Sequence, residues 1–399
     1  ITRKQPSSKH SLLSSINSPM SFPQVKVNVA NGNLMQSVAV LDSVPALMLT
    51  VSTEELVAKT QEVYSLADAE SKGYTAEAEP FAHHLIEEYY NELGGNQRLF
   101  IFGTAASMTM AEALTATEAN GVSKLLRDGR GDINLIAIAR KPQTGYQPGT
   151  AFLDSDVPVA VTACKTVGEA MQTANTPVRF IIEGRVANAG KTNDYKPQDA
   201  TNGYACVLLG GTSPDGSAAV SVLLARACKY GSHIKVGNGQ NGVLSVQQVY
   251  IGADKYEDRV DMETLHNAGF LTFMHRPGSA GYYFGRDNMC SKDDFRILVH
   301  GRVIDKAQRI AAATYAPYIE TGITMNADGT INATEAADIE NTLEQAILAS
   351  MGDQISQAGV YVDLNQDIIN TSTINIQLRI MPLGYLTWIT VSLGLAATL

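Results

Sequence analysis

The sequence is poor in the residues that mark secreted, metal-binding or redox proteins. Only 4 of its 399 residues are cysteines, one is tryptophan, and 18% are charged. The cysteines Cys164, Cys206, Cys228 and Cys290 form no CxxC pair, and no histidine stands beside them as zinc ligands do. We therefore expect four reduced, mostly buried thiols in a cytoplasmic protein.

An excess of basic residues is also absent. The chain has 30 Lys and Arg against 40 Asp and Glu, which leaves a formal net charge of −10 at pH 7. Nucleic-acid-binding proteins concentrate Lys and Arg on their surface, whereas the longest basic cluster here, Arg127 to Arg130, is interrupted by Asp128. The composition therefore argues against nucleic acid as a partner.

No apolar run approaches the roughly 20 residues that cross a membrane, so we expect no membrane insertion. Residues 1–19 contain Lys4 and Lys9 but lack the apolar centre of a secretory signal, and we expect a disordered leader there. Met20 resembles a natural start, so residues 1–19 are open to a second interpretation as an addition to the native chain.

What the sequence does contain is a set of short runs in which apolar and polar residues alternate. They lie at 25–29, 360–364, 374–380 and 389–393. Side chains on a strand switch faces at every residue, so each run predicts a strand with one buried and one solvent-facing side. Strands at both chain ends leave open sheet edges, and open edges pair with other chains. The pattern favours an assembly protein over a catalyst.

The middle of the chain has an α/β pattern. Continuous apolar runs alternate with helical stretches, which predicts a largely parallel sheet covered on both faces. The expected strands are 99–102, 133–138, 178–182, 205–209 and 270–274. One helix is expected to begin at Ser52 or Thr53. Further helices are expected over 79–92, 109–127, 164–175, 216–230 and 257–267.

From about residue 290 the pattern changes to helices followed by strands. Amphipathic helices are expected over 302–316 and 335–351, the second opening with Asn332 and Glu335 at capping-box spacing. Asp328-Gly329 predicts a turn between the two helices. These helices can cover one face of the terminal sheet.

Two glycine-rich stretches resemble nucleotide-binding loops. Residues 237–242 match GxGxxG, but they lead into an expected strand at 243–246, whereas a dinucleotide site opens a helix. Gly184 and Gly190-Lys191-Thr192 are separated by five residues, where a P-loop needs four. We expect a hairpin loop and a surface loop, and keep a nucleotide- or dinucleotide-binding α/β enzyme as the alternative.

Other candidate catalytic or metal groups are weak. His83 and His84 are adjacent on a helix and face different directions, so they cannot chelate one ion. Asp293 and Asp294 are expected to be solvated, and no nucleophile–base–acid set can be built around Ser279. We expect no catalytic residue, cofactor or metal, and no enzyme.

Several segments in the carboxy-terminal part resemble a known family in their order and spacing. They are LHNAGFLTF (265–273), GYYFGRD (281–287), DDFR (293–296), RVIDKA (302–307), LRIMPLG (378–384) and ITVSLG (389–394). This order is similar to that of the tail sheath proteins of contractile phages and contractile injection particles, and residues 23–34 are similar to one branch of them. The match covers about 257–399 and the amino-terminal arm, whereas 51–256 match in organisation only.

The resemblance implies a structural subunit that polymerises as stacked rings around an inner tube and contracts to drive that tube through a target envelope. It implies four parts: the leader 1–19, an arm with a linking strand at 20–50, an α/β sheath body at 51–289, and an α+β assembly domain at 290–399 with a terminal strand arm. The implied partners are further copies of the chain, the inner tube protein, and baseplate and tail-terminator proteins. Assembly would occur in the bacterial cytoplasm, within a virion tail or phage-tail-like particle.

In that family, terminal arms add strands to neighbouring subunits. Strands 25–29 and 389–393 are the natural donors here, and 360–364 and 374–380 the natural receiving pair. The apolar linking residues are Val25, Val27, Val29, Ile374, Ile376, Leu378, Ile380, Ile389, Val391 and Leu393.

The acidic side of the helix at 335–351 is a candidate for the tube-facing surface. It carries Glu335, Asp338, Glu340 and Glu344. An ordinary solvated acidic face is the competing interpretation of these residues. Another self-assembling protein, such as a tube or capsid subunit, is a further alternative for the whole chain, but the α/β middle argues against it.

Overall fold

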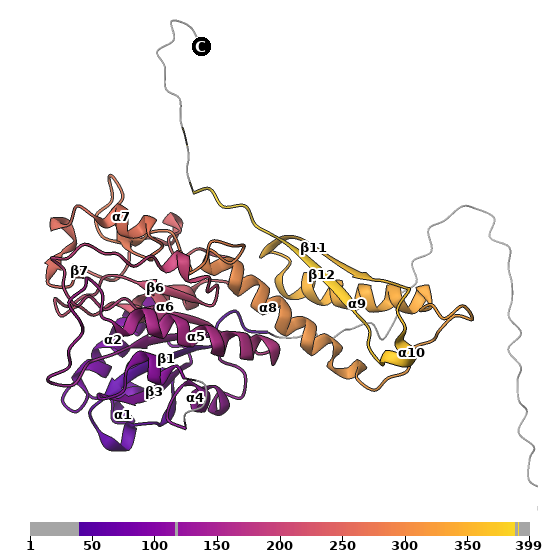
Figure 1. The fold of residues 1–399 in the computed structure, drawn as a ribbon, viewed down its shortest axis with the longest axis horizontal. Coiled ribbons are helices and arrows are strands. Elements are labelled where there is room, and N and C mark those ends of the chain that lie inside the picture. The colour runs from indigo at the N-terminus through magenta and orange to yellow at the C-terminus, as the bar shows by residue number, and fades with distance from the viewer. Residues whose placement is uncertain (1–39, 116–118, 388–389, 391–399) are drawn as a thin grey trace, which may run out of the picture. The chain divides into compact units, whose positions relative to one another are not determined.

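The computed structural model describes residues 40–115, 119–387 and 390, and a mixed sheet forms the centre of its α/β body (Figure 1). Within these residues the sheet has six strands in the order β2-β3-β1-β4-β5-β6. All neighbours are parallel except β2, which pairs antiparallel with β3. The bounds are β1 Pro45–Val51, β2 Thr60–Val63, β3 Leu99–Ala105, β4 Leu135–Ala139, β5 Arg179–Glu183 and β6 Ala205–Leu208.

Helices cover both faces of this sheet, as the continuous apolar runs predicted. Leu47 and Leu49 of β1 face one core, and Ala46 and Met48 face the other, because successive side chains point to opposite sides. The first core is covered by α1 Leu66–Ser71, α2 Pro80–Leu93 and α6 Val220–Lys229. The second is covered by α3 Met110–Ala113, α4 Val122–Asp128 and α5 Asp156–Thr173.

Strand β1 was not predicted and corrects one proposed boundary. It lies between β3 and β4, and all seven of its residues are buried. Pro45 is its first residue, a position where the missing N–H is tolerated. The arm predicted at 20–50 is therefore too long, because residues 45–50 belong to the body sheet.

Two predicted helices were also wrong in extent. The helix expected from Ser52 or Thr53 is a single 3₁₀ turn, Glu54–Leu56, because the chain turns back to place β2 on the edge of β3. The helix expected over 109–127 is divided into α3 and α4, the second beginning after Gly121.

Residues 237–290 form short elements, and backbone bonds from Leu271 and Cys290 lie along the outer edge of β6. Leu271 bridges Leu208 in parallel, so the strand expected at 270–274 is only partly regular. Residues 243–246 are not a strand; Leu244 N donates to Tyr282 O instead. The regular elements are β7 Tyr250–Ile251, β8 Asp254–Lys255, α7 Met262–Asn267, β9 Phe273–Met274 and β10 Tyr283–Phe284.

The carboxy-terminal part contains the predicted helices and terminal strands. Figure 1 shows α9 lying along the β11–β12 pair, with α8 leading to it from the body. These elements share two small cores of their own. Their bounds are α8 Leu298–Tyr315, α9 Ala333–Met351, β11 Ile355–Val362, α10 Ile368–Thr371 and β12 Ile376–Pro382. Among the described residues, no helix combines the length and apolar character that a membrane span requires.

Candidate assembly site

Strands β11 and β12 form a two-stranded antiparallel sheet. Their register runs from Val362 opposite Ile376 to Ile355 opposite Pro382, with an irregularity between Ile355 and Gln357. Within the described residues neither strand has a second partner. Each strand therefore presents one edge without a strand partner among the described residues, although Val362 N of β11 already donates to Glu340 Oε1.

The two faces of this sheet differ as the alternation predicted. Val360, Leu378 and Ile380 pack against the core formed with α8 and α9, while Ile374 and Ile376 pack against the smaller core near Ile331. On the opposite face Tyr361 is 56% exposed and Met381 is 58% exposed. This settles which side of the hairpin is covered within the subunit.

The predicted strand donors cannot be compared in the same way. Val25, Val27, Val29, Ile389, Val391 and Leu393 lie outside the described residues. Strand exchange between subunits therefore stays a prediction.

The four acidic residues of α9 do not form a single set. Glu340 Oε1 accepts a hydrogen bond from Val362 N at 2.7 Å, and Glu335 Oε2 accepts one from Thr324 N at 2.7 Å. These two carboxylates hold the end of β11 and the loop before α9. Asp338 is exposed and Glu344 is half-buried.

The predicted capping box at the start of α9 is only half formed. Asn332 Oδ1 accepts from Thr334 N, as a helix cap should. Asn332 N is already bonded to Thr324 O, so the Glu335 side chain bonds to Thr324 N instead.

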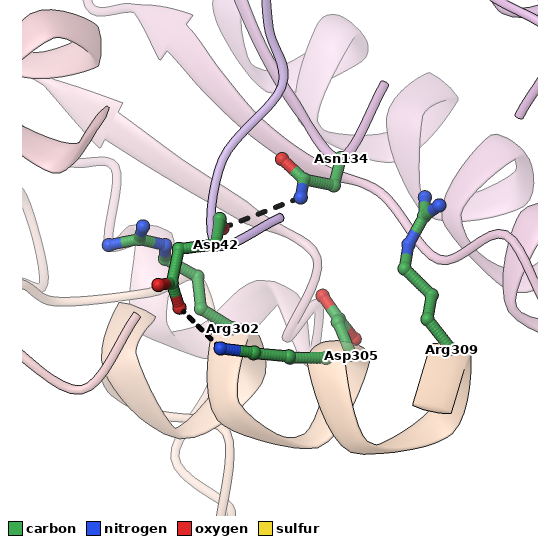
Figure 2. A pocket seen from close by; sticks show the side chains of 6 residues that line it. Asp42, Asn134, Arg302, Asp305 and Arg309 are labelled. Atoms are coloured by element: carbon green, nitrogen blue, oxygen red, sulfur yellow. Dashed lines mark hydrogen bonds and ion pairs between the residues drawn. The ribbon is translucent and has the colours of Figure 1, made fainter. Parts of the chain in front are cut away.

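A buried ionic cluster joins α8 to the body (Figure 2). Arg179 of β5 binds Asp305 of α8 through two hydrogen bonds of 2.6 Å, and both side chains are at most 5% exposed. Gly301 makes this approach possible, because a Cβ there would lie 2.8 Å from the Arg179 guanidinium carbon. One turn further along α8, Arg309 donates to three backbone oxygens, those of Gly131, Ile133 and Pro177.

The same cluster reaches the first described residues of the chain. Lys306 Nζ donates to Asp42 Oδ1 at 3.0 Å, and Asn134 Nδ2 donates to Asp42 O at 3.4 Å (Figure 2). Arg302 donates to Ser43 Oγ at 2.6 Å. One face of α8 thus binds both the sheet and the segment that enters β1.

The carboxyl edge of a parallel sheet is where α/β proteins commonly bind nucleotides. Here, buried carboxylates of the chain itself accept hydrogen bonds from the backbone amides at that edge. Glu79 accepts from Ser52 N and Thr53 N, the amides that follow β1. Asp156 accepts from Met110 N and Ala111 N, at the start of α3.

Glu183 acts in the same way at the end of β5. It is fully buried and accepts from Arg140 N at 2.9 Å and Ala218 N at 3.2 Å. Burial raises the pKa of Glu183 to about 7, although Arg185 and the two amides oppose the shift. These carboxylates were missed from sequence because nothing local distinguishes them from surface acids.

The two glycine-rich stretches have no phosphate-loop geometry. Lys191 is exposed, and Gly190 N donates to Asn188 Oδ1 within the loop. Residues 239–241 form a 3₁₀ turn, and Gly242 has a φ of 74°. In this described part of the chain neither stretch opens an α-helix, so both are loops, although the hairpin expected after 237–242 is wrong.

The remaining polar candidates have structural partners. His83 Nε2 lies 2.9 Å from Glu70, and His84 Nε2 lies 3.2 Å from Glu88, which raises the pKa of His84. Asp293 Oδ1 accepts from Phe295 N in a local turn. The four cysteines are free and buried. The described residues contain no group of three or more His, Cys, Asp or Glu side chains arranged to hold a metal.

Comparison with family models covers both parts of the chain. The model of the DUF2586 N-terminal domain matches residues 22–288, and that of the DUF2586 C-terminal domain matches residues 294–399. The chain belongs to the DUF2586 family. No curated protein matches this DUF2586 chain in sequence.

Solved structures similar to this DUF2586 protein are sheath proteins. The contracted helical sheath of the anti-feeding prophage (AFP) is 16% identical, with a TM-score of 0.63 over 94% of this chain and 99% of that one. The contracted sheath complex of the extracellular contractile injection system PVC is 11% identical, with a TM-score of 0.60 over 95% and 99%. A sheath tail protein from Listeria innocua is 13% identical, with a TM-score of 0.51 over 87% and 93%. The DUF2586 chain therefore has the fold of contractile sheath proteins, and the resemblance seen in the motif order is confirmed.

Proposed function

We propose that this protein is the structural subunit of a contractile tail sheath. The observation that carries the proposal is the β11–β12 sheet, whose outer strand edges have no further strand partner within the described residues, in a chain with the sheath fold. The role is structural and not catalytic: the amides at the usual ligand edge of the sheet are bonded by Glu79, Asp156 and Glu183. Nothing observed favours the nucleotide-binding alternative.

Subunits are linked by added strands. Residues 25–29 and 389–393 of neighbouring chains would pair with the open edges of β11 and β12 by β-augmentation. Burial of three Val, Ile or Leu side chains per donor strand would stabilise the link by about 5–9 kcal/mol before ordering costs. Such a link survives subunit rotation while weaker contacts between the bodies exchange.

The assembled particle is a helical stack of rings around an inner tube. Its partners are further copies of the chain, the inner tube protein, and baseplate and tail-terminator proteins, and Asp338 and Glu344 of α9 are candidates for contact with the tube. The domain plan is an amino-terminal arm ending before β1, an α/β body to about residue 289, and the assembly domain from 290. The protein would assemble in the bacterial cytoplasm as part of a phage tail or a phage-tail-like particle.

Electron microscopy of the purified full chain tests the proposal. Long hollow striated polymers are expected, and deletion of residues 1–34 or of the residues after 386 should leave soluble single chains. A matched pair of variants separates the effect of strand pairing from the effect of lost side-chain area. Val391→Pro removes a backbone donor and should stop polymerisation. Val391→Thr keeps that donor and should still polymerise. Folded full-length protein that stays single at high concentration would overturn the proposal.

A further inference from the structure

The two ends of the described chain are held by the same small set of residues. The segment 40–44 enters the body just before β1, and the segment 383–387 follows β12. Both contact α8 and the short loop at 231–236 that follows α6. We name these contacts the root cluster; its members are Asp42, Ser43, Ser232, His233, Lys235, His300, Arg302, Lys306 and Tyr385.

The amino-terminal root is fixed by Asp42. Its Oδ1 accepts from Ser232 N at 3.2 Å, Ser232 Oγ at 2.8 Å and Lys306 Nζ at 3.0 Å. Partial burial alone would raise the pKa of Asp42, but the bonds from Ser232 and Lys306 lower it below its ordinary value. Arg302 adds the bond to Ser43, so residues 42 and 43 both bind α8.

The carboxy-terminal root is fixed by Tyr385. Its hydroxyl donates to His233 O at 2.8 Å, Lys235 Nζ lies 4.9 Å from its ring centre, and the His300 ring lies at 6.3 Å. Leu386, the next residue, is 86% exposed, so the described contact ends at Tyr385. Burial raises the pKa of Tyr385 to about 12, which keeps its hydroxyl protonated as a donor.

The two roots meet at adjacent residues of one tight loop. Ser232 binds Asp42, and the carbonyl of His233 binds Tyr385. The loop closes on itself through Ile234 N to Gly231 O, and a Cβ on Gly231 would lie 2.9 Å from the His233 ring. Because Ser232 and His233 are the two central residues of the turn that this bond closes, we expect a shift at Ser232 to move the carbonyl of His233.

Resting on the sheath function proposed above, we infer that Asp42 and Tyr385 are positioning residues that fix both terminal arms to one shared support. Loosening either root therefore loosens the other. In an assembly held together by its arms, this coupling would fix the spacing between the points where the two arms leave the subunit.

The single tryptophan of the chain provides a reporter for the test. Trp388 stands three positions after Tyr385 in the sequence and lies outside the described residues. We expect its time-resolved fluorescence anisotropy to report motion at the carboxy-terminal root. The decisive variant is Asp42→Ala, which changes the opposite root. It should increase the fast-decaying part of the Trp388 anisotropy, as should Tyr385→Ala, with Tyr385→Phe intermediate because the ring contacts remain.

Two matched controls lie outside the root cluster. Asp68→Ala removes another carboxylate paired with a lysine, and Tyr361→Ala removes another tyrosine, on the outer face of β11. Neither should change the anisotropy. The measurement uses the full chain at a concentration where sedimentation shows single subunits.

Hydrogen exchange reads the same contacts in single or assembled chains. Tyr385→Ala should speed exchange of the Ser232 and Ile234 amides by roughly five- to tenfold, the loss expected for about one hydrogen bond. If the Asp42→Ala variant does not fold, the Ser232→Ala variant takes its place in the experiment, because it removes only the hydroxyl donor to Asp42.

Independent roots would overturn the inference. That result is an unchanged Trp388 signal in Asp42→Ala or Ser232→Ala, together with unchanged exchange at Ser232 in Tyr385→Ala. The outcome is distinct from failure of the sheath function. Polymers with independent roots would refute only the shared support, and linked roots in a chain that never polymerises would refute only the sheath function.

Discussion

At the scale of single residues, the connection between the body and α8 depends on buried charges. Among the described residues, Asp305 is the only carboxylate within hydrogen-bonding distance of Arg179. A buried ion pair adds little compared with an apolar pair, but removal of one partner leaves an uncompensated charge in a medium of low polarity. Single substitutions here should therefore be costly.

Asp305→Asn should lower the free energy of unfolding by about 3–5 kcal/mol, because Arg179 stays buried without its counter-charge. Urea unfolding followed by circular dichroism measures the change. Asp294→Asn, an exposed acid just before α8, is the control and should change it by less than about 0.5 kcal/mol. Equal effects of the two variants would show that the ion pair does not hold α8 to the sheet.

Glu183 gives the protein a predictable dependence on pH. Its pKa is about 7 when folded and about 4.5 when unfolded, so the folded state holds the proton more tightly. The resulting stability is fully present below about pH 4.5 and is lost as the pH rises to about 7. The free energy of unfolding of the wild type, measured relative to that of Glu183→Gln, should increase by on the order of 2–3 kcal/mol from pH 8 to pH 5.

Thermal or urea unfolding of both proteins at several pH values measures this difference. Glu55→Gln, an exposed acid, serves as the control and should show no such change relative to wild type. A constant difference between wild type and Glu183→Gln across this range would mean that Glu183 is ionised in the folded protein throughout.

At the scale of elements, the alternation of β11 and β12 was the most informative local pattern. It correctly predicted which side chains of 360–364 and 374–380 face the helices. Helix 79–92 was also predicted nearly to its ends, since α2 is Pro80–Leu93. Patterns failed at the short 3₁₀ turn Glu54–Leu56 that precedes β2, and also at the central strand β1, which was not predicted.

A pair of neighbouring substitutions on β12 tests the register. Leu378→Asp places a charge against the core formed with α8 and α9 and should lower the unfolding free energy by about 2 kcal/mol. Gln377→Asp changes the exposed face and should alter it by less than about 0.5 kcal/mol. Thermal melting compares them, and the reverse order of effects would indicate a register shifted by one residue.

At the scale of the whole molecule, the acidic residues of α9 have different roles. Glu340 holds Val362 N within the subunit, whereas Asp338 is exposed to solvent. If the tube contacts this helix, the exposed acid should matter for binding and the bonded one for stability.

Asp338→Lys should weaken co-sedimentation with the tube protein by roughly two- to tenfold, because it reverses a solvent-facing charge, and should leave the melting temperature unchanged. Glu340→Gln should lower the melting temperature and leave tube binding intact. Wild-type binding by Asp338→Lys would support an ordinary solvated acidic face.

The features that repeat along the chain could be predicted from the amino-acid sequence alone. Continuous apolar runs specified a buried parallel sheet, alternation specified the faces of β11 and β12, and the order of motifs indicated the sheath fold. The packing of whole elements was needed to show that β1 lies at the centre of the sheet, that Glu79 and Glu183 bind amides at its carboxyl edge, and that Asp42 and Tyr385 contact adjacent residues of one loop. Such contacts join residues far apart in the chain, and because they depend on where whole elements pack, they leave no period or spacing in the sequence.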